Sequence, residues 1–215
     1  TLSELKMPGV IQIKDGETFE QGAFYGCTSL MNVESPSLKD IGKYAFFNCI
    51  SISKLDMPEV TRVGVYAFGA CITLVSINIP KVIEIEAYAF YSCNLSAGIN
   101  IPEVEMIGSS AFMCCHGLES INLPNIQNIE ARTFWESGLK KIDLPDTVTS
   151  IGSYAFGYCS ELVEVNIPNS VTNIGEGAFH NCSVLRKVNI PDSVTDIGIC
   201  AFAYCSKLEE INIPD

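Results

Sequence analysis

The sequence is poor in the side chains and motifs that enzymes commonly use. Its 215 residues include one tryptophan and two histidines, His116 and His180. It has no Gly-x-Ser-x-Gly elbow, no phosphate-binding loop and no histidine-rich metal motif. Twenty-five acidic residues are present, but nothing singles out a catalytic carboxylate pair. We therefore expect no enzymatic activity, no cofactor and no metal.

Features that would place the chain in a membrane or on nucleic acid are also missing. There is no run of eighteen apolar residues, no N-terminus of the signal-peptide type and no lipidation motif. Lysine and arginine number 13 against 25 aspartates and glutamates, which gives a net charge of −12. Because so acidic a chain repels phosphate backbones, we expect no nucleic-acid partner. The lack of a long apolar run leads us to expect no direct membrane insertion.

A repeat runs through nearly the whole chain. All ten prolines occupy one phase of it: Pro8, Pro36, Pro58, Pro80, Pro102, Pro124, Pro145, Pro168, Pro191 and Pro214. A second phase is a phenylalanine, spaced by 22 residues six times and then by 23 twice, at Phe24, Phe46, Phe68, Phe90, Phe112, Phe134, Phe156, Phe179 and Phe202. No linker interrupts the period, which is typical of a solenoid whose coils bury their apolar sides against one another.

Two local patterns alternate within each unit, as residues 148–168 show. Residues 165–167 alternate apolar and polar side chains, which predicts a short strand, and the proline that follows ends it because proline donates no ladder hydrogen bond. Ala155, Phe156 and Cys159 fall on one side of a helical or 3-10 turn. The fold class we predict is therefore an α/β repeat solenoid.

The cysteines follow the same period. Eight of the ten stand three residues after the repeat phenylalanine: Cys27, Cys49, Cys71, Cys93, Cys115, Cys159, Cys182 and Cys205. One thiol per coil at an inward phase predicts a buried column of inert thiols, with disulfides between neighbouring coils as the alternative. Zinc is disfavoured because close-spaced Cys-x-x-Cys pairs are absent, although residues 114–116 form one Cys-Cys-His cluster worth a metal assay.

The unit resembles the BspA-like leucine-rich repeats of surface proteins from host-associated bacteria and some protists. The likeness is carried by runs such as Ile151-Gly-Ser-Tyr-Ala-Phe-Gly-Tyr-Cys159 followed by Leu162-Val-Glu-Val-Asn-Ile-Pro168, and it covers essentially the whole chain. The resemblance implies a right-handed leucine-rich repeat superhelix with a parallel concave β-sheet and short helical or 3-10 turns on the convex side. It also implies binding to proteins of a host or a neighbouring cell rather than catalysis.

We expect one solenoid over residues 1–215, with about ten strand turns of 22–23 residues. Both ends fall at the same phase and neither shows a polar cap, so we expect an excised part of a longer protein. Two coils depart from the pattern. Ser96 replaces a repeat leucine and Thr133 a repeat alanine, and Glu86 and Glu130 replace a repeat glycine. These irregular coils are candidates for loose packing or a bend.

The polar residue between the inward positions of each strand forms an outward column. Its members are Glu34, Asp56, Asn78, Asn100, Asn122, Asp143, Asn166, Asn189 and Asn212. The column is either a stabilising amide ladder or the floor of a concave binding surface flanked by Lys54, Lys141 and Lys187, and both interpretations are compatible. A secondary contact site is predicted at Trp135, beside Arg132, Lys140 and Lys141.

A group of acidic residues on three consecutive coils has two interpretations. Its members are Glu84, Glu86, Glu103, Glu105 and Glu130. Carboxylates bind calcium, but no Asp- or Asn-rich loop with a central glycine accompanies them, so a solvated acidic face is favoured.

From these features we predict a non-catalytic binding or adhesion module at an extracellular or cell-surface location. Its concave face would recognise a protein partner, a surface protein of the host or of a neighbouring cell, through Asp56, Asn78, Asn100, Asn122, Asp143, Asn166 and Asn189 and the residues that flank them. Two alternatives stay open: a cytoplasmic protein-interaction scaffold, since unpaired thiols suit a reducing compartment, and a carbohydrate-binding module of a larger enzyme.

Overall fold

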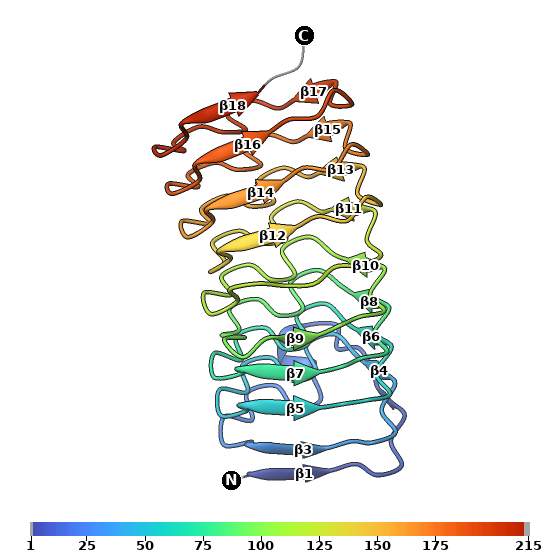
Figure 1. Cartoon of the computed structure of the whole chain (residues 1–215). Helices are drawn as coiled ribbons and strands as arrows, with labels where there is room; N and C mark the ends of the chain where they lie inside the picture. The colour runs from blue at the N-terminus through green and yellow to red at the C-terminus, as the bar shows by residue number, and fades with distance from the viewer. Residues whose placement is uncertain (1, 213–215) are drawn as a thin grey trace.

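The computed structural model describes residues 2–212, and its coils pile up along one axis from the N-terminus to the C-terminus (Figure 1). Each coil has three sides: a strand of two or three residues, a second strand of two residues, and a series of tight turns. The repeat proline Pro214 lies outside the described residues. The predicted fold class, a leucine-rich repeat solenoid with stacked parallel strands, is confirmed.

The strands that precede the repeat proline form the first side, which we call ladder A. Its strands are β1 (Glu4–Lys6), β3 (Asn32–Glu34), β5 (Lys54–Asp56), β7 (Ser76–Asn78), β9 (Ile99–Asn100), β12 (Lys141–Asp143), β14 (Glu164–Asn166), β16 (Lys187–Asn189) and β18 (Glu210–Asn212). Equivalent residues pair in parallel register, as Leu55 does with Ile77. The middle residue of a three-residue strand faces the core and its neighbours face solvent, as the alternation predicted.

A second ladder, ladder B, was not expected from the sequence. It comprises β2 (Gln12–Ile13), β4 (Asp40–Ile41), β6 (Arg62–Val63), β8 (Glu84–Ile85), β10 (Met106–Ile107), β11 (Asn128–Ile129), β13 (Ser150–Ile151), β15 (Asn173–Ile174) and β17 (Asp196–Ile197). Two-residue strands are too short to display the alternation from which strands are predicted.

The repeat glycine after ladder B is explained by close approach between coils. A Cβ atom added at Gly108 would lie 2.6 Å from the backbone nitrogen of Ala87, and one at Gly152 would lie 2.7 Å from that of Ala131. A side chain at these glycines would require the neighbouring backbone to shift, which favours glycine at this phase. The glycine phase therefore allows consecutive coils to pack at hydrogen-bonding distance.

The third side consists of turns rather than helices. Among the described residues the only helix is η1 (Phe19–Gln21). Residues two before and two after the repeat phenylalanine adopt left-handed backbone angles, as at Tyr154 (φ 55°) and Tyr158 (φ 60°), and such residues interrupt any helix. The predicted side-chain phase was right, but the local conformation is a chain of turns. Each turn donates to the next coil, for example from the Phe156 amide to the Ala178 carbonyl at 2.8 Å.

The core contains one continuous stack of phenylalanine rings. Successive centroids lie 5.1–5.6 Å apart from Phe24 to Phe202, with planes within 15° of parallel. The seven rings from Phe46 to Phe179 are completely buried. These rings confirm that equivalent positions of the repeat lie above one another.

The thiol column runs beside this stack. Seven of its cysteines direct Sγ at the carbonyl of the phenylalanine one coil earlier, at 3.0–3.1 Å, beginning with Cys49 and Phe24. All ten cysteines are free thiols. Burial raises the pKa of Cys49 and of Cys159 to about 12. The column residue is therefore a small apolar group that also satisfies a buried carbonyl.

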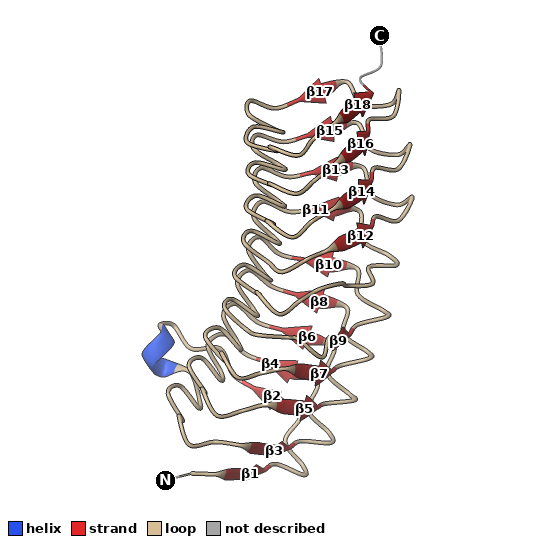
Figure 2. Ribbon diagram, turned by 60° about the vertical axis from the view of Figure 1, so that its left-hand side comes forward, coloured by secondary structure: helices blue, strands red, loops and turns tan. Residues whose placement is uncertain are grey.

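Both ladders are interrupted at one common level, and within the described chain ladder A has a second break between β3 and β5, which do not pair. Ladder A has no strand between β9 and β12, and ladder B has no pairing between β10 and β11. The turn side is continuous there, since the Ser110 amide donates to Ala131 at 3.0 Å and the Phe112 amide to Thr133 at 2.9 Å. Between the two halves, as far as the chain is described, the turn side therefore keeps its hydrogen bonds, ladder B has none, and the ladder A side keeps one, from the Lys140 amide to the Glu119 carbonyl at 3.0 Å. Figure 2 shows that the pile of ladder B strands from β8 to β2 steps sideways below this interruption.

Candidate functional site

The outward face of ladder A carries the predicted column of polar residues. Asp56, Asn100, Asn122, Asp143, Asn166 and Asn189 are exposed, Asn78 is half-buried, and the flanking Lys54, Lys141 and Lys187 are exposed. Asp143, Asn166 and Asn189 occupy equivalent positions on paired strands. Asn122 belongs to the same column but lies where ladder A has no strand. The structure thus gathers these ten residues on one face of the solenoid.

The amides of this face are linked in the N-terminal half. The Asn78 side-chain amide donates to an Asp56 carboxylate oxygen at 2.7 Å, and the Asn100 amide donates to the Asn78 oxygen at 2.7 Å. Between Asn166 and Asn189 no such side-chain bond occurs within the described chain. The N-terminal half therefore holds its polar groups in a ladder, whereas the C-terminal half leaves them available to solvent or a partner.

Charges alternate beside the column in the C-terminal half. Lys141 pairs in register with Glu164, Glu164 with Lys187, and Lys187 with Glu210. The Lys187 Nζ lies 3.1 Å from a Glu210 carboxylate oxygen, and both side chains are well exposed. This face consequently offers paired charges and amides on a backbone fixed by ladder hydrogen bonds, which suits polar complementarity with another surface.

Trp135 does not join this face, because it lies on the turn side of its coil. It is half-buried in an aromatic cluster, with its ring centroid 4.6 Å from that of Tyr158 and the Arg132 guanidinium 6.0 Å above it. The predicted proximity to Arg132 is observed. Lys140 instead contacts Glu119 at 2.7 Å, and that hydrogen bond raises the pKa of Lys140. The core separates Trp135 from Lys141 on ladder A.

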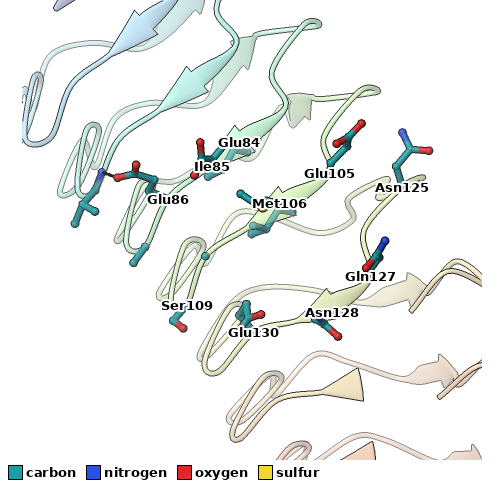
Figure 3. A pocket seen from close by; sticks show the side chains of 14 residues that line it. Glu84, Ile85, Glu86, Glu105, Met106, Ser109, Asn125, Gln127, Asn128 and Glu130 are labelled. Carbon is teal, nitrogen blue, oxygen red and sulfur yellow. Dashed lines mark hydrogen bonds between the residues drawn. The ribbon is translucent and has the colours of Figure 1, made fainter. Parts of the chain in front are cut away.

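A groove at the interruption escaped the sequence analysis. It has a volume of about 880 Å³ and is lined by β8, β10 and β11 together with residues between the last two strands (Figure 3). Glu84, Glu86, Glu105 and Glu130 line it, so four members of the predicted acidic group meet there. The signals in the sequence were this acidic group and the replacement of the repeat glycine by Glu86 and Glu130.

The described residues contain neither a metal-binding cluster nor a helix that could cross a membrane. Within residues 2–212, no three side chains among His, Cys, Asp and Glu are close enough to hold a metal ion. No helix in the same range is long and apolar enough to cross a membrane.

Comparison with protein families gives one match. The family described as a BspA type leucine rich repeat region matches residues 10–118 and 127–215, in six copies. The unmatched stretch between the two ranges coincides with the interruption of both ladders. No curated protein matches the sequence significantly.

Several solved structures share the fold. A leucine rich cell surface protein from Faecalibacterium prausnitzii A2-165 aligns with 98% of this chain and 81% of its own, at 23% identity and a TM-score of 0.51. Leucine-rich repeat proteins from Eubacterium ventriosum (20% identity, 98% and 67% of the chains, TM-score 0.61) and Bacteroides ovatus (20% identity, 97% and 86%, TM-score 0.50) align similarly. At these identities the likeness concerns the fold.

Proposed function

The chain belongs to the BspA-type leucine-rich repeat family, and from this premise we propose that it is a binding module whose ladder A face recognises a protein at a cell surface. The family has a non-catalytic fold, so the activity is recognition rather than chemistry. The surface location is motivated by the resemblance to repeats of bacterial surface proteins, one of which is the structure from Faecalibacterium prausnitzii. The partner would be a surface protein of a host or a neighbouring cell.

One observation carries this proposal: polar side chains recur at one phase on a backbone that hydrogen bonds hold from coil to coil. Asn166 and Asn189 are exposed on three-residue strands whose middle residues are buried, and Asn100 is exposed on the two-residue strand β9. A surface that is rigid before binding loses little conformational entropy when a partner docks. Amides and paired charges provide both donors and acceptors, and these favour a protein surface over an anionic polymer.

The test is a binding screen on arrayed extracellular protein domains with a matched pair of double variants. Asn100→Arg with Asn122→Arg places two cations on the ladder A face and is expected to abolish binding to any domain that the native chain captures. Asn169→Arg with Asn173→Arg adds the same charge on exposed positions away from that face and is expected to leave binding unchanged. If both double variants bind as the native chain does, ladder A is not the recognition surface.

Two other functions each have an observation in their favour. The ten free thiols favour an intracellular scaffold, because unpaired thiols suit a reducing compartment. This function would be supported if the native chain captured only cytoplasmic proteins and the ladder A double variant lost that binding. The cluster of Trp135, Tyr154 and Tyr158 favours a carbohydrate-binding module, because aromatic faces stack on apolar surfaces of ligands. A glycan array bound by the native chain and not by Trp135→Ala would select that function.

A further inference from the structure

The interruption leaves two strand edges facing each other across the groove. In the closed rung below it, the carbonyls of Ile83 and Ile85 accept hydrogen bonds from the amides of Glu105 and Gly108, at 3.0 and 2.8 Å. The equivalent carbonyls at the β10 edge belong to Glu105, which precedes the strand, and to Ile107. Within residues 2–212 neither of these carbonyls receives a main-chain hydrogen bond from the next coil.

The opposite edge is unpaired as well. The amides of Gln127 and Glu130, which flank β11, correspond to those of Glu105 and Gly108 one coil earlier, and they donate no hydrogen bond in the part of the chain that is described. The open edge thus presents acceptors on β10 and donors beside β11. Exposed strand edges of this kind readily pair with an added strand.

Open space and an apolar contact lie between the two edges. The groove of about 880 Å³ is lined by both edges. Figure 3 shows Met106 on one side and Asn128 on the other, at the ends of the two facing strands. Met106 is 55% exposed, whereas its neighbour Ile107 is buried. An added strand would therefore cover an exposed methionine and complete a ladder that is closed above and below.

The negative charge around the groove indicates which kind of ligand it would bind. Glu84, Glu105 and Glu130 line it without an ion-pair partner in the described chain, and no lysine or arginine is among the lining residues. The nearby cation, Arg62, is already engaged, with Asp40 at 2.7 Å and Glu86 at 2.6 Å. A ligand that carries positive charge is complementary to this surface.

We propose that the groove between β10 and β11 binds an extended peptide rich in lysine or arginine by strand addition. The peptide amides would donate to the carbonyls of Glu105 and Ile107, and its carbonyls would accept from the amides of Gln127 and Glu130. Alternate basic side chains would reach the carboxylates that line the groove. This site is separate from the ladder A face and does not depend on the function proposed for it.

The probe is a fluorescein-labelled hexapeptide of alternating lysine and valine, and the measurement is fluorescence anisotropy with the native chain. A peptide of the same sequence that is N-methylated at every residue keeps its charge but donates no main-chain hydrogen bond. Strand addition predicts that N-methylation weakens binding at least about tenfold. Equal affinity for the two peptides would overturn the proposal, because charge alone would then explain the binding.

A pair of triple variants tests the location. The first replaces the three groove carboxylates by Glu84→Gln, Glu105→Gln and Glu130→Gln. The second removes the same charge elsewhere by Asp146→Asn, Glu164→Gln and Asp192→Asn, which are exposed residues away from the groove. We expect at least about a tenfold loss of affinity in the first and less than about twofold in the second. Equal losses would place the peptide outside the groove.

One more variant tests the edge without any change in charge. Gln127→Pro removes an amide that has no internal partner, while the Gln127 carbonyl continues to accept from the Thr149 amide. Its melting temperature should stay close to native while the lysine–valine peptide binds several-fold more weakly. Unchanged affinity in a folded Gln127→Pro variant would overturn the pairing scheme. The double variant Asn100→Arg with Asn122→Arg should leave affinity for the lysine–valine peptide unchanged. A result that refutes protein recognition by ladder A can therefore be distinguished from one that refutes peptide binding in the groove.

Discussion

Replacement of Phe112 by alanine tests how the two halves of the solenoid are held together. The ring is completely buried, and its centroid lies 5.5 Å from that of Phe90 and 5.6 Å from that of Phe134. The contact with Phe134 spans the level at which both ladders are open. Loss of a buried phenylalanine side chain typically lowers the free energy of unfolding by about 3–5 kcal/mol, through lost transfer energy and the cavity that remains.

The position of Phe112 adds a second expectation. Coils of a solenoid interact mainly with their nearest neighbours, so weakening the turn side, which carries most of the contact between the halves, should uncouple them. Urea unfolding followed by circular dichroism should show one transition for the native chain and two for Phe112→Ala, with the first at lower urea.

The matched control is Phe202→Ala. That ring is partly exposed and stacks on one described neighbour, Phe179, at 5.3 Å. Its removal should cost roughly half as much, since about half of the packing contacts are lost. Glu119→Ala, which changes an exposed side chain, should be nearly neutral. Equal destabilisation by Phe112→Ala and Phe202→Ala, or a single unchanged transition for Phe112→Ala, would refute the reasoning.

Three further predictions concern the thiols and the ion pairs. Because burial raises the pKa of Cys159 from 9.0 to about 12, its contribution to stability is complete below pH 9 and is lost as the pH rises towards 12. The melting temperature should therefore fall over that range, and fall less in Cys159→Ala; an identical fall in both would contradict this. With a thiol reagent at pH 8, the exposed Cys200 should react well before Cys159, and equal rates would argue against the buried column. Arg62→Ala should lower the free energy of unfolding by about 1–2 kcal/mol because Asp40 and Glu86 lose a shared, mostly covered partner. Adding Glu86→Gly restores the repeat residue and should recover part of that loss in urea unfolding, whereas a further loss would count against the explanation.

The sequence predicted the inward positions well because burial recurs at one phase in every coil. Phe112 and Cys115 are examples of the phenylalanine column and the cysteine column. A side chain at a buried position of the repeat must be apolar or must form hydrogen bonds within the protein. The polar column that includes Asn100 was equally visible, since its members alternate with buried residues. Repetition therefore revealed the core, the fold class and the candidate face of ladder A.

Features that depend on contact between coils could not be predicted in this way. Ladder B consists of pairs of residues such as Glu84–Ile85, too short for a periodic signal. The left-handed angle of Tyr154 is compensated by a hydrogen bond from its amide to Glu176 of the next coil, a partner that its local sequence does not specify. The separation of Trp135 from Lys141 likewise reflects the three-sided shape of the coil.

The groove shows most clearly the difference between what the sequence predicts and what depends on contact between coils. The residues that make it unusual were visible in the sequence as departures from the repeat, above all Glu130 in place of glycine. Whether such a residue closes the rung or leaves it open depends on its surroundings: Glu86, at the same phase, sits in a closed rung with its carboxylate held by Arg62, whereas Glu130 lines the open one. Which residues are buried can be predicted from their order, because burial recurs with the repeat. Whether one coil pairs with the next depends on the positions of backbone amides and carbonyls in three dimensions, so the place where strand pairing ends is visible only in the tertiary structure.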